Sequence, residues 1–468
     1  MNRRALPSQV QHGIDTNQCS PDTPVLRSIV LAVLSFALRI FFSRIEVEGG
    51  TRLPSDRAML FVLNHPNGLV DPLVLLCFAP RRVSFLAKEP LFRLPVIGAI
   101  VRALDALPVY RTMDNADPRK NAETFAQART ILARGGAIGM FPEGTTHSDS
   151  RLRPLKTGAA RIALGAAAGE DAKPMAIVPA GLYYTNKGTF RSKALLVFGA
   201  PIDVPALPSA ADPPREAVNA LSKRIREGLL DVTVNAADDE ALAWVARAQR
   251  IFSAPQDGTG ALASEFALRR RFVEGFEAYG RIMPARLLAL EQRIAAYEQE
   301  TARFGVVPDR IPLEAEDTER VARQEGILSL LAGPAALGAL VHWPLYRFIG
   351  WVSNRFVAPR DSTVVSTVKL CASMVAYPLL WLAVSLATGG HLGATAALGV
   401  LLLCPVCAWS AVLFEERWIR LCEVAAPLAL RRRDAAEFER LRQERLSIRA
   451  EIERMYETLE GTRPGLNR

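Results

Sequence analysis

Cysteine is scarce in this chain, which has six in 468 residues, and three of them (Cys371, Cys404 and Cys407) lie in apolar segments. So few thiols in so long a chain exclude the disulfide framework of a small secreted domain. Cys404 and Cys407 have the spacing of half a zinc or redox site, but no second pair accompanies them. We therefore interpret the cysteines as small apolar residues, and we expect neither a metal nor a bound cofactor.

Charge is absent from residues 370–414, which contain no Asp, Glu, Lys or Arg. A Gly389-Gly390 pair divides this stretch into two segments, each near the roughly 20 residues that cross a bilayer. A third apolar segment, residues 327–346, contains a Gly333-Pro334 pair. The sequence therefore predicts apolar membrane segments over residues 326–415.

The orientation of these segments is constrained by the arginines that flank residues 370–414, because basic flanks favour the cytoplasmic side. If residues 327–346 also crossed the membrane, everything before them would be forced to the other side. We therefore interpret residues 327–346 as re-entrant or interfacial, since a Gly-Pro break is tolerated where neighbouring protein satisfies the backbone. The expected location is an inner or cytoplasmic membrane, with the active domain facing the cytoplasm.

Acidic residues are too few to balance the basic ones, and the net charge is +9. Such a surplus suits nucleic acid, anionic lipid or an anionic substrate. No nucleic-acid-binding motif is present, so we expect membrane lipids as partners and no nucleic acid. Residues 25–42 are apolar with Arg27 and Arg39 near their ends. This pattern predicts a membrane-associated helix over 25–43, whose long side chains reach the headgroups, with a buried core helix as the alternative.

The region from residue 44 to 235 alternates short β-rich runs with helical patterns, which predicts a layered α/β domain with a mostly parallel sheet. Residues 236–325 are charged and space their apolar residues at three and four, which predicts a solvent-facing helical hairpin or coiled-coil arm. Residues 1–24 lack the basic, apolar and cleavage-site segments of a secretory signal in their usual order, and we predict a disordered tail. For residues 416–468 we predict a charged C-terminal helix. The expected strands are residues 59–65, 83–89, 107–111, 137–144, 176–184 and 195–201, and the expected helices include 119–135 and 155–169.

A histidine stands at the end of the first of these strands, in the stretch "FVLNHPNGLVDP". Pro66-Asn67-Gly68 predicts a turn after His65, and the helix that follows has Asp71 in its first turn. The carboxylate can then hold one ring nitrogen while the other accepts a proton from an alcohol. No G-x-S-x-G nucleophile is present, so the substrate's own hydroxyl would have to attack. Taken alone, His65 can equally be a turn histidine bonded to a nearby aspartate.

Two further stretches carry groups suited to a phosphate. "FPEGTTH" predicts a tight turn at Pro142-Glu143-Gly144-Thr145 that exposes backbone N–H groups, and cationic side chains follow it. Arg111 ends another strand and would add a planar bidentate donor. An ordinary strand-to-helix loop is the alternative for the first of these stretches. The cations after the turn are Arg151, Arg153 and Lys156.

Together the stretches "NHPNGLVDP", "VRALDALPVYR", "FPEGTTH" and "AIVPAGL" resemble, in order and spacing, the motifs of the glycerolipid acyltransferase superfamily. The resemblance covers residues 25–230. It implies transfer of an acyl group from acyl-CoA or acyl-carrier protein to the hydroxyl of glycerol 3-phosphate or a related (lyso)phospholipid acceptor, with no metal. It also implies that His65 is the base and Asp71 its orienting partner. For the acceptor it implies Arg111, Glu143, Gly144 and Thr145, with Lys156 as a further cation.

The sequence departs from the family pattern at two places. Five residues separate His65 from Asp71 where the family usually has four, and this variant resembles enzymes that acylate glycerol 3-phosphate and dihydroxyacetone phosphate. Thr146 stands where the family has an arginine, so part of the phosphate charge must come from the other cations. A non-catalytic lipid-binding or scaffold membrane protein is the alternative function. A lipid hydrolase is disfavoured because its nucleophile is missing.

Overall fold

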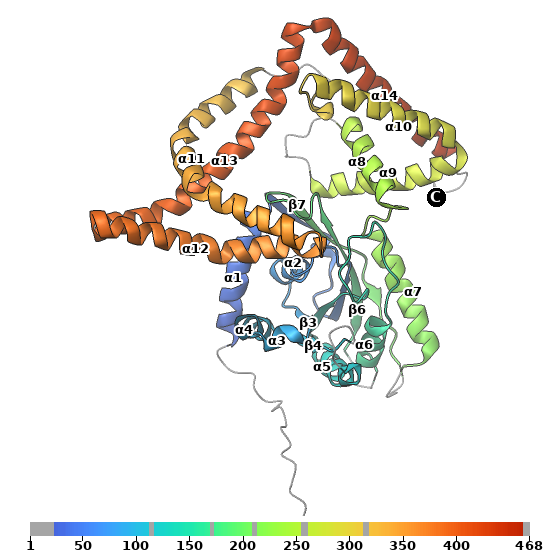
Figure 1. The fold of residues 1–468 in the computed structure, drawn as a ribbon. Helices are drawn as coiled ribbons and strands as arrows, with labels where there is room; N and C mark the ends of the chain where they lie inside the picture. The colour runs from blue at the N-terminus through green and yellow to red at the C-terminus, as the bar shows by residue number, and fades with distance from the viewer. Residues whose placement is uncertain are drawn as a thin grey trace, which may run out of the picture.

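The computed structural model describes residues 23–111, 117–168, 173–207, 213–253, 261–311 and 318–461 (Figure 1). Most of the expected N-terminal tail, residues 1–22, therefore lies outside the described residues. Three parts are distinguishable in the figure: an α/β domain, a bundle of helices, and a long helical hairpin that extends to the left of the view.

The α/β domain is built on one mostly parallel sheet with the strand order β1-β7-β6-β2-β5-β3-β4, and β8 pairs with β6. Among these strands only the β6–β7 and β6–β8 pairs are antiparallel. All six predicted strands are confirmed, whereas β1 and β8 were not predicted. The bounds are β1 (Arg44–Glu48), β2 (Ala58–Leu63), β3 (Ser84–Lys88), β4 (Leu107–Val109), β5 (Ala137–Met140), β6 (Met175–Tyr184), β7 (Lys193–Phe198) and β8 (Ile202–Asp203).

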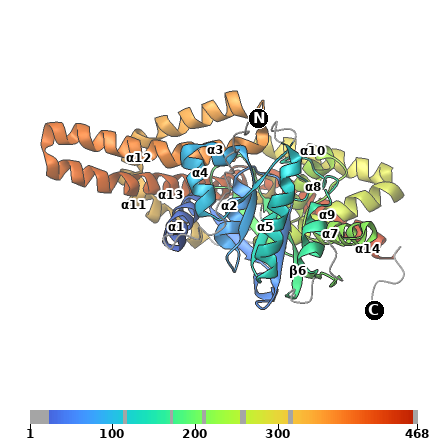
Figure 2. The same cartoon turned by 90° about the horizontal axis from the view of Figure 1, so that it is seen from below.

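Helices cover both faces of this sheet (Figure 2). Every residue of β2, "AMLFVL", is buried, as expected for a central parallel strand that has a core on each side. One core contains side chains of α5 (Asn121–Ala133), α6 (Gly158–Ala166) and α7 (Arg215–Asp231). The other contains side chains of α1 (Thr23–Phe41) and α2 (Val70–Phe78). Two short helices, α3 (Pro90–Arg93) and α4 (Pro95–Ala103), lie between β3 and β4 along the chain.

Helix α1 is neither a pure core helix nor a free one. Leu38 and Phe41 are buried in the second core, while Val25, Ile29 and Phe36 on the same helix are exposed. Arg27 was expected to reach lipid headgroups, and this is wrong. Arg27 is 5% exposed, and its guanidinium donates to Asp105 (2.9 Å) and to the Val83 carbonyl (2.9 Å), because the α/β domain supplies these acceptors next to α1.

The charged region after the α/β domain forms part of a four-helix bundle rather than a free hairpin or arm. Its helices are α8 (Asp239–Phe252), α9 (Leu262–Ile282) and α10 (Pro284–Arg303), and they share one apolar core with the C-terminal α14 (Ala435–Gly461). Arg445 of α14 is fully buried and donates to the carbonyls of Ile251, Ser253, Asp309 and Ile311. The apolar stripe on these helices, from which a free arm was predicted, is covered by α14, which lies far along the chain.

Three helices of the described residues are long and apolar enough to cross a membrane: Ile327–Val357, Ser362–Leu392 and Ala394–Arg433. They correspond to α11 (Thr318–Val352), α12 (Val365–Leu392) and α13 (Ala394–Arg433). The α12–α13 hairpin turns at Gly393, where φ is +87°, and not at the predicted Gly389-Gly390 pair. Helix α11 continues unbroken through Gly333 and Pro334, so the re-entrant interpretation is wrong.

Candidate active site

The loops that carry the predicted motifs follow two neighbouring strands. β2 and β5 are parallel, with Met59 opposite Ala137, so both strands end at the same edge of the sheet. His65 follows β2, and Glu143 follows β5. The carboxyl edge of a parallel sheet is where such folds place their chemistry, and here it brings the two loops into contact.

His65 and Asp71 meet as predicted. The ring Nδ1 lies 2.9 Å from Asp71 Oδ2, and the carboxylate is fully buried. The same oxygen accepts from the Asn67 N–H at 2.6 Å, and the Tyr184 hydroxyl donates to Oδ1 at 2.7 Å. Burial and the neighbouring Asp71 raise the pKa of Tyr184 well above its ordinary value, so this phenol keeps its proton and donates it. Three donors thus hold one carboxylate in place.

The ring of His65 is held from several sides. It stacks on Phe141 with ring centroids 3.6 Å apart and planes 1° from parallel, and its side chain is 16% exposed. Its backbone N–H donates to Glu143 Oε1 at 3.2 Å, and its carbonyl accepts from the His147 N–H at 3.2 Å. Because Nδ1 is used by Asp71, Nε2 is the ring nitrogen that can take a proton from a substrate.

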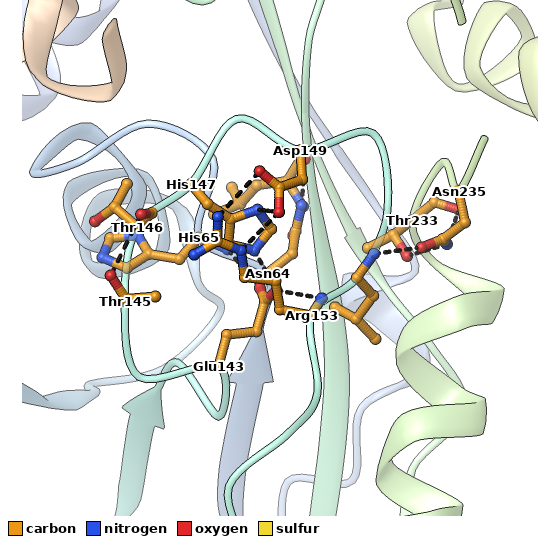
Figure 3. A network of polar contacts seen from close by, with 12 residues as sticks. Asn64, His65, Glu143, Thr145, Thr146, His147, Asp149, Arg153, Thr233 and Asn235 are labelled. Atoms are coloured by element: carbon orange, nitrogen blue, oxygen red, sulfur yellow. Dashed lines mark hydrogen bonds and ion pairs between the residues drawn. The ribbon is translucent and has the colours of Figure 1, made fainter. Parts of the chain in front are cut away.

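Glu143 holds the two loops together (Figure 3). Its side chain is fully buried, and besides the His65 N–H it accepts from the Arg153 N–H at 2.9 Å and bonds to the His147 ring. This position suits indirect support of His65 more than direct contact with an acceptor. The role of His147 was not predicted, although its place four residues after Glu143 is visible in the sequence.

Two predicted cations converge on the Gly144 turn. Arg111 Nη1 lies 3.5 Å from the Gly144 carbonyl oxygen. Gly144 has φ of +74°, and a Cβ added there would lie 2.5 Å from Lys156 Nζ, so Lys156 passes directly over the turn. The Thr145 hydroxyl contacts the Thr146 carbonyl at 3.4 Å on the same turn. Arg111, Gly144, Thr145 and Lys156 are thus brought together as predicted.

The other two cations have their own partners. Arg153 forms an ion pair with Asp149 at 2.6 Å, and Arg151 donates to the Ala236 carbonyl at 3.0 Å. Among the described residues, no group of three or more His, Cys, Asp or Glu side chains is placed to hold a metal ion.

A cavity lies beside His65, between the motif loops and the segment that follows α7. Figure 3 labels several of the residues that line it, among them Glu143, Thr233 and Asn235. Its wall includes both histidines of the site and polar groups from residues 233–235, which no motif had indicated. The cavity is small, with a volume of about 40 Å³, and His65 forms part of its wall. The lining residues are Asn64, His65, Pro66, Glu143, His147, Asp149, Arg151, Leu152, Thr233, Val234 and Asn235.

Comparison with known proteins agrees with the motifs. Residues 44–183 match the family model described as Acyltransferase. Glycerol-3-phosphate O-acyltransferases 2 and 1 of Saccharomyces cerevisiae are 27% and 25% identical, over 58% and 75% of this chain and 38% and 58% of their own lengths. A chloroplastic 1-acyl-sn-glycerol-3-phosphate acyltransferase of Arabidopsis thaliana is 33% identical over 31% of this chain and 38% of its own. The chain thus spans less than two thirds of the length of each of these relatives. It contains an acyltransferase domain of the glycerolipid acyltransferase superfamily.

Proposed function

We propose that this chain is a membrane-bound O-acyltransferase. It transfers a fatty acyl group from acyl-CoA or acyl-carrier protein to the hydroxyl of glycerol 3-phosphate or a related (lyso)phospholipid. The observation that carries the proposal is the 2.9 Å contact between His65 and the buried Asp71 beside a cavity. The names of the relatives support the same reaction class.

The chemistry follows from the orientation of the ring. Nε2 of His65 takes the proton of the acceptor hydroxyl as its oxygen bonds to the thioester carbonyl carbon. The tetrahedral intermediate then collapses, the carbon–sulfur bond breaks, and the imidazolium returns the proton to the leaving thiolate. Asp71 stabilises the imidazolium between these steps. General base catalysis of this kind contributes roughly 10²–10⁴ in rate, and positioning of the two substrates supplies much of the rest.

The phosphate of the acceptor is assigned to the Gly144 turn, where Arg111 and Lys156 converge. Two cationic side chains beside one turn are a favourable phosphate site. Glycerol 3-phosphate is the favoured acceptor for two reasons. The two yeast relatives with that specificity in their names align with more of this chain than the plant protein does, and the bend between His65 and Asp71 has five residues.

We further propose that only α12 and α13 cross the membrane. The bundle supports this, because α14 follows the apolar helices while α8, α9 and α10 precede them, and all four share one core. Both ends of the apolar region must then lie on one side, which requires an even number of crossings. Helix α11 is assigned to the interface. Tryptophan side chains favour that depth, and Trp343 and Trp351 are exposed along it.

Labelling of single cysteines with a membrane-impermeant maleimide in sealed vesicles tests this arrangement. In a cysteine-free background, Glu274→Cys on α9 and Arg454→Cys on α14 are expected to label from the same side. His391→Cys at the hairpin tip is expected to label from the other side. Opposite sidedness of Glu274→Cys and Arg454→Cys would reject the arrangement.

The proposed activity is tested by incubating membranes that contain the protein with a labelled acyl donor and a panel of acceptors. The donors are acyl-CoA and acyl-carrier protein, and the acceptors are glycerol 3-phosphate, dihydroxyacetone phosphate and lysophosphatidic acid. Acyl incorporation that is abolished by His65→Ala but retained by His391→Ala supports the proposal. Release of free fatty acid alone would indicate a hydrolase. Neither product, with the protein folded in the membrane, would favour the non-catalytic alternative.

A further inference from the structure

The start of α12 contacts the loop between His65 and Asp71, although about 180 residues separate α12 from the end of the acyltransferase match. The Leu69 N–H donates to the Thr367 hydroxyl oxygen at 3.1 Å. Leu69 is the N-cap of α2, and its side chain cannot accept a hydrogen bond from the helix N-terminus. A helix leaves its first N–H groups without partners of its own, so Thr367 supplies from outside an acceptor that the local sequence lacks.

The start of α12 lies so close to the bend that position 68 favours glycine. Gly68 has φ of +47°, and a Cβ added there would lie 3.0 Å from the Thr363 carbonyl oxygen and 3.1 Å from Thr367 Oγ1. Side chains are disfavoured at this φ, and here the added atom would also press against α12. Glycine at position 68 therefore lets the start of α12 pack directly against the five-residue bend between His65 and Asp71.

A second loop of the site is held by the same two turns of α12. Lys369 Nζ donates to the Gly188 carbonyl at 2.7 Å, and the Ser366 hydroxyl donates to the Lys187 carbonyl. The Lys187 carbonyl also lies 3.4 Å from Asn67 Nδ2, which links this loop to the His65 bend. The loop follows Tyr184, whose hydroxyl bonds to Asp71. Both loops that position the Asp71 carboxylate thus rest on one end of an apolar helix.

We propose that the first two turns of α12 are a positioning element of the active site, and that Thr367 is a positioning residue that fixes the bend between His65 and Asp71. The proposal rests on the proposed acyltransferase function for its catalytic consequence. It gives the α12–α13 hairpin a role besides membrane attachment, because the geometry of the His65–Asp71 pair depends on it.

Three variants in the full-length protein test this role. Thr367→Val keeps the shape of the side chain and removes the acceptor for the Leu69 N–H. Thr367→Ser restores a hydroxyl. Thr388→Val is the matched control, because it makes the same chemical change on the same helix, at a hydroxyl that bonds within the described residues to the Val384 carbonyl of α12.

Hydrogen exchange and steady-state kinetics are measured on all three variants. Loss of the acceptor is expected to speed exchange of the Leu69 amide about tenfold and to lower kcat about tenfold, with the acceptor KM unchanged. Thr367→Ser is expected to recover both values, and Thr388→Val to match the wild type. Unchanged exchange in Thr367→Val would overturn the contact, and faster exchange with wild-type kcat would overturn the positioning role. If the wild type transfers no acyl group to any acceptor, the proposed function fails, while the exchange result still decides the contact.

Discussion

Replacing Asp71 by asparagine isolates the charge of the carboxylate from its geometry. Asp71 Oδ2 accepts from both the His65 ring and the Asn67 N–H, while Oδ1 accepts only from the Tyr184 hydroxyl among the described contacts. An asparagine can keep its oxygen at the first position and point its amide at Tyr184, which can accept a hydrogen bond as well as donate one. The variant should therefore preserve the orientation of His65 and lose the negative charge beside it.

The magnitude follows from the distance between the charges. Nδ1 and Oδ2 are 2.9 Å apart, so the centres of the imidazolium and carboxylate charges lie about 4 Å apart. With an effective dielectric constant of about 20, that separation corresponds to about 4 kcal/mol of stabilisation of the imidazolium. Since each 1.36 kcal/mol is a factor of ten in rate, we expect kcat to fall about 10³-fold. The acceptor KM should change little, because Asp71 is buried and does not contact the acceptor.

The assay is initial-rate acyl transfer from acyl-CoA to glycerol 3-phosphate, measured for Asp71→Asn, His65→Ala and the double variant in the same membranes. Groups that act as one unit are not additive, so the double variant should be no slower than His65→Ala alone. Circular dichroism of the purified variants checks that they are folded. An Asp71→Asn enzyme within about fivefold of the wild type would refute the assigned role of the carboxylate. So would a double variant whose loss equals the product of the single losses.

Two further substitutions test the surroundings of the pair. Arg111→Ala should raise the KM for glycerol 3-phosphate about tenfold with little change in kcat. Arg153→Ala is the control and should leave this KM unchanged, because the Arg153 guanidinium pairs with Asp149. An unchanged KM in Arg111→Ala would remove Arg111 from the phosphate site. Tyr184→Phe should lower the free energy of unfolding, measured with denaturant, by about 1.5–3 kcal/mol, because the buried Asp71 carboxylate loses a donor at 2.7 Å. Tyr183→Phe, on the opposite face of β6, is the control. Equal losses in the two variants would show that the bond to Asp71 contributes nothing specific.

The strands could be predicted wherever an apolar run was long enough to be recognised. β2 and β6 are buried almost throughout and read as near-continuous apolar runs, as central parallel strands do. β1 is "RIEVE", an edge strand that is half exposed and has three charged residues in five. β8 has only two residues. Neither carries a hydrophobic pattern that stands out from a loop, and both form because the sheet edge or β6 offers them a partner.

In the helical regions, an amphipathic pattern predicts a helix but does not identify the element that packs against it. Apolar residues at spacings of three and four predicted helices with an apolar stripe in residues 236–325, but the helix that covers this stripe, α14, begins at Ala435. Nothing in a local pattern identifies a partner so distant in the chain. The turn of the apolar hairpin was misplaced for a related reason. Gly389 and Gly390 both stay helical, and the chain turns only at Gly393, where a positive φ is required.

The site divides in the same way between local and distant contacts. His65 and Asp71 are six residues apart across one turn, so their contact follows from the strand-turn-helix pattern alone. Tyr184 and Thr367 reach the same turn from 113 and 298 residues away. Their hydroxyls have no sequence signature, because any Tyr or Thr on a buried element looks the same until the fold places it.

Both ends of the α12–α13 hairpin are bonded to the α/β domain, so the proposed crossing of the bilayer by this hairpin would set the depth of the site. Lys369 holds the start of α12 at the Gly188 carbonyl, and Glu416 of α13 accepts from Arg191 at 2.5 Å. Arg191 also donates to the carbonyl of Ile40 at the end of α1 (3.1 Å), which joins α1 to the same point. About 46 residues lie between Lys369 and Glu416, so each arm of the hairpin has about 23 residues and a length of about 35 Å, close to the roughly 30 Å of the hydrocarbon core. If α12 and α13 cross the bilayer as proposed, arms of this length would exceed the hydrocarbon core by only about 5 Å, and the cavity beside His65 would lie close to the membrane surface.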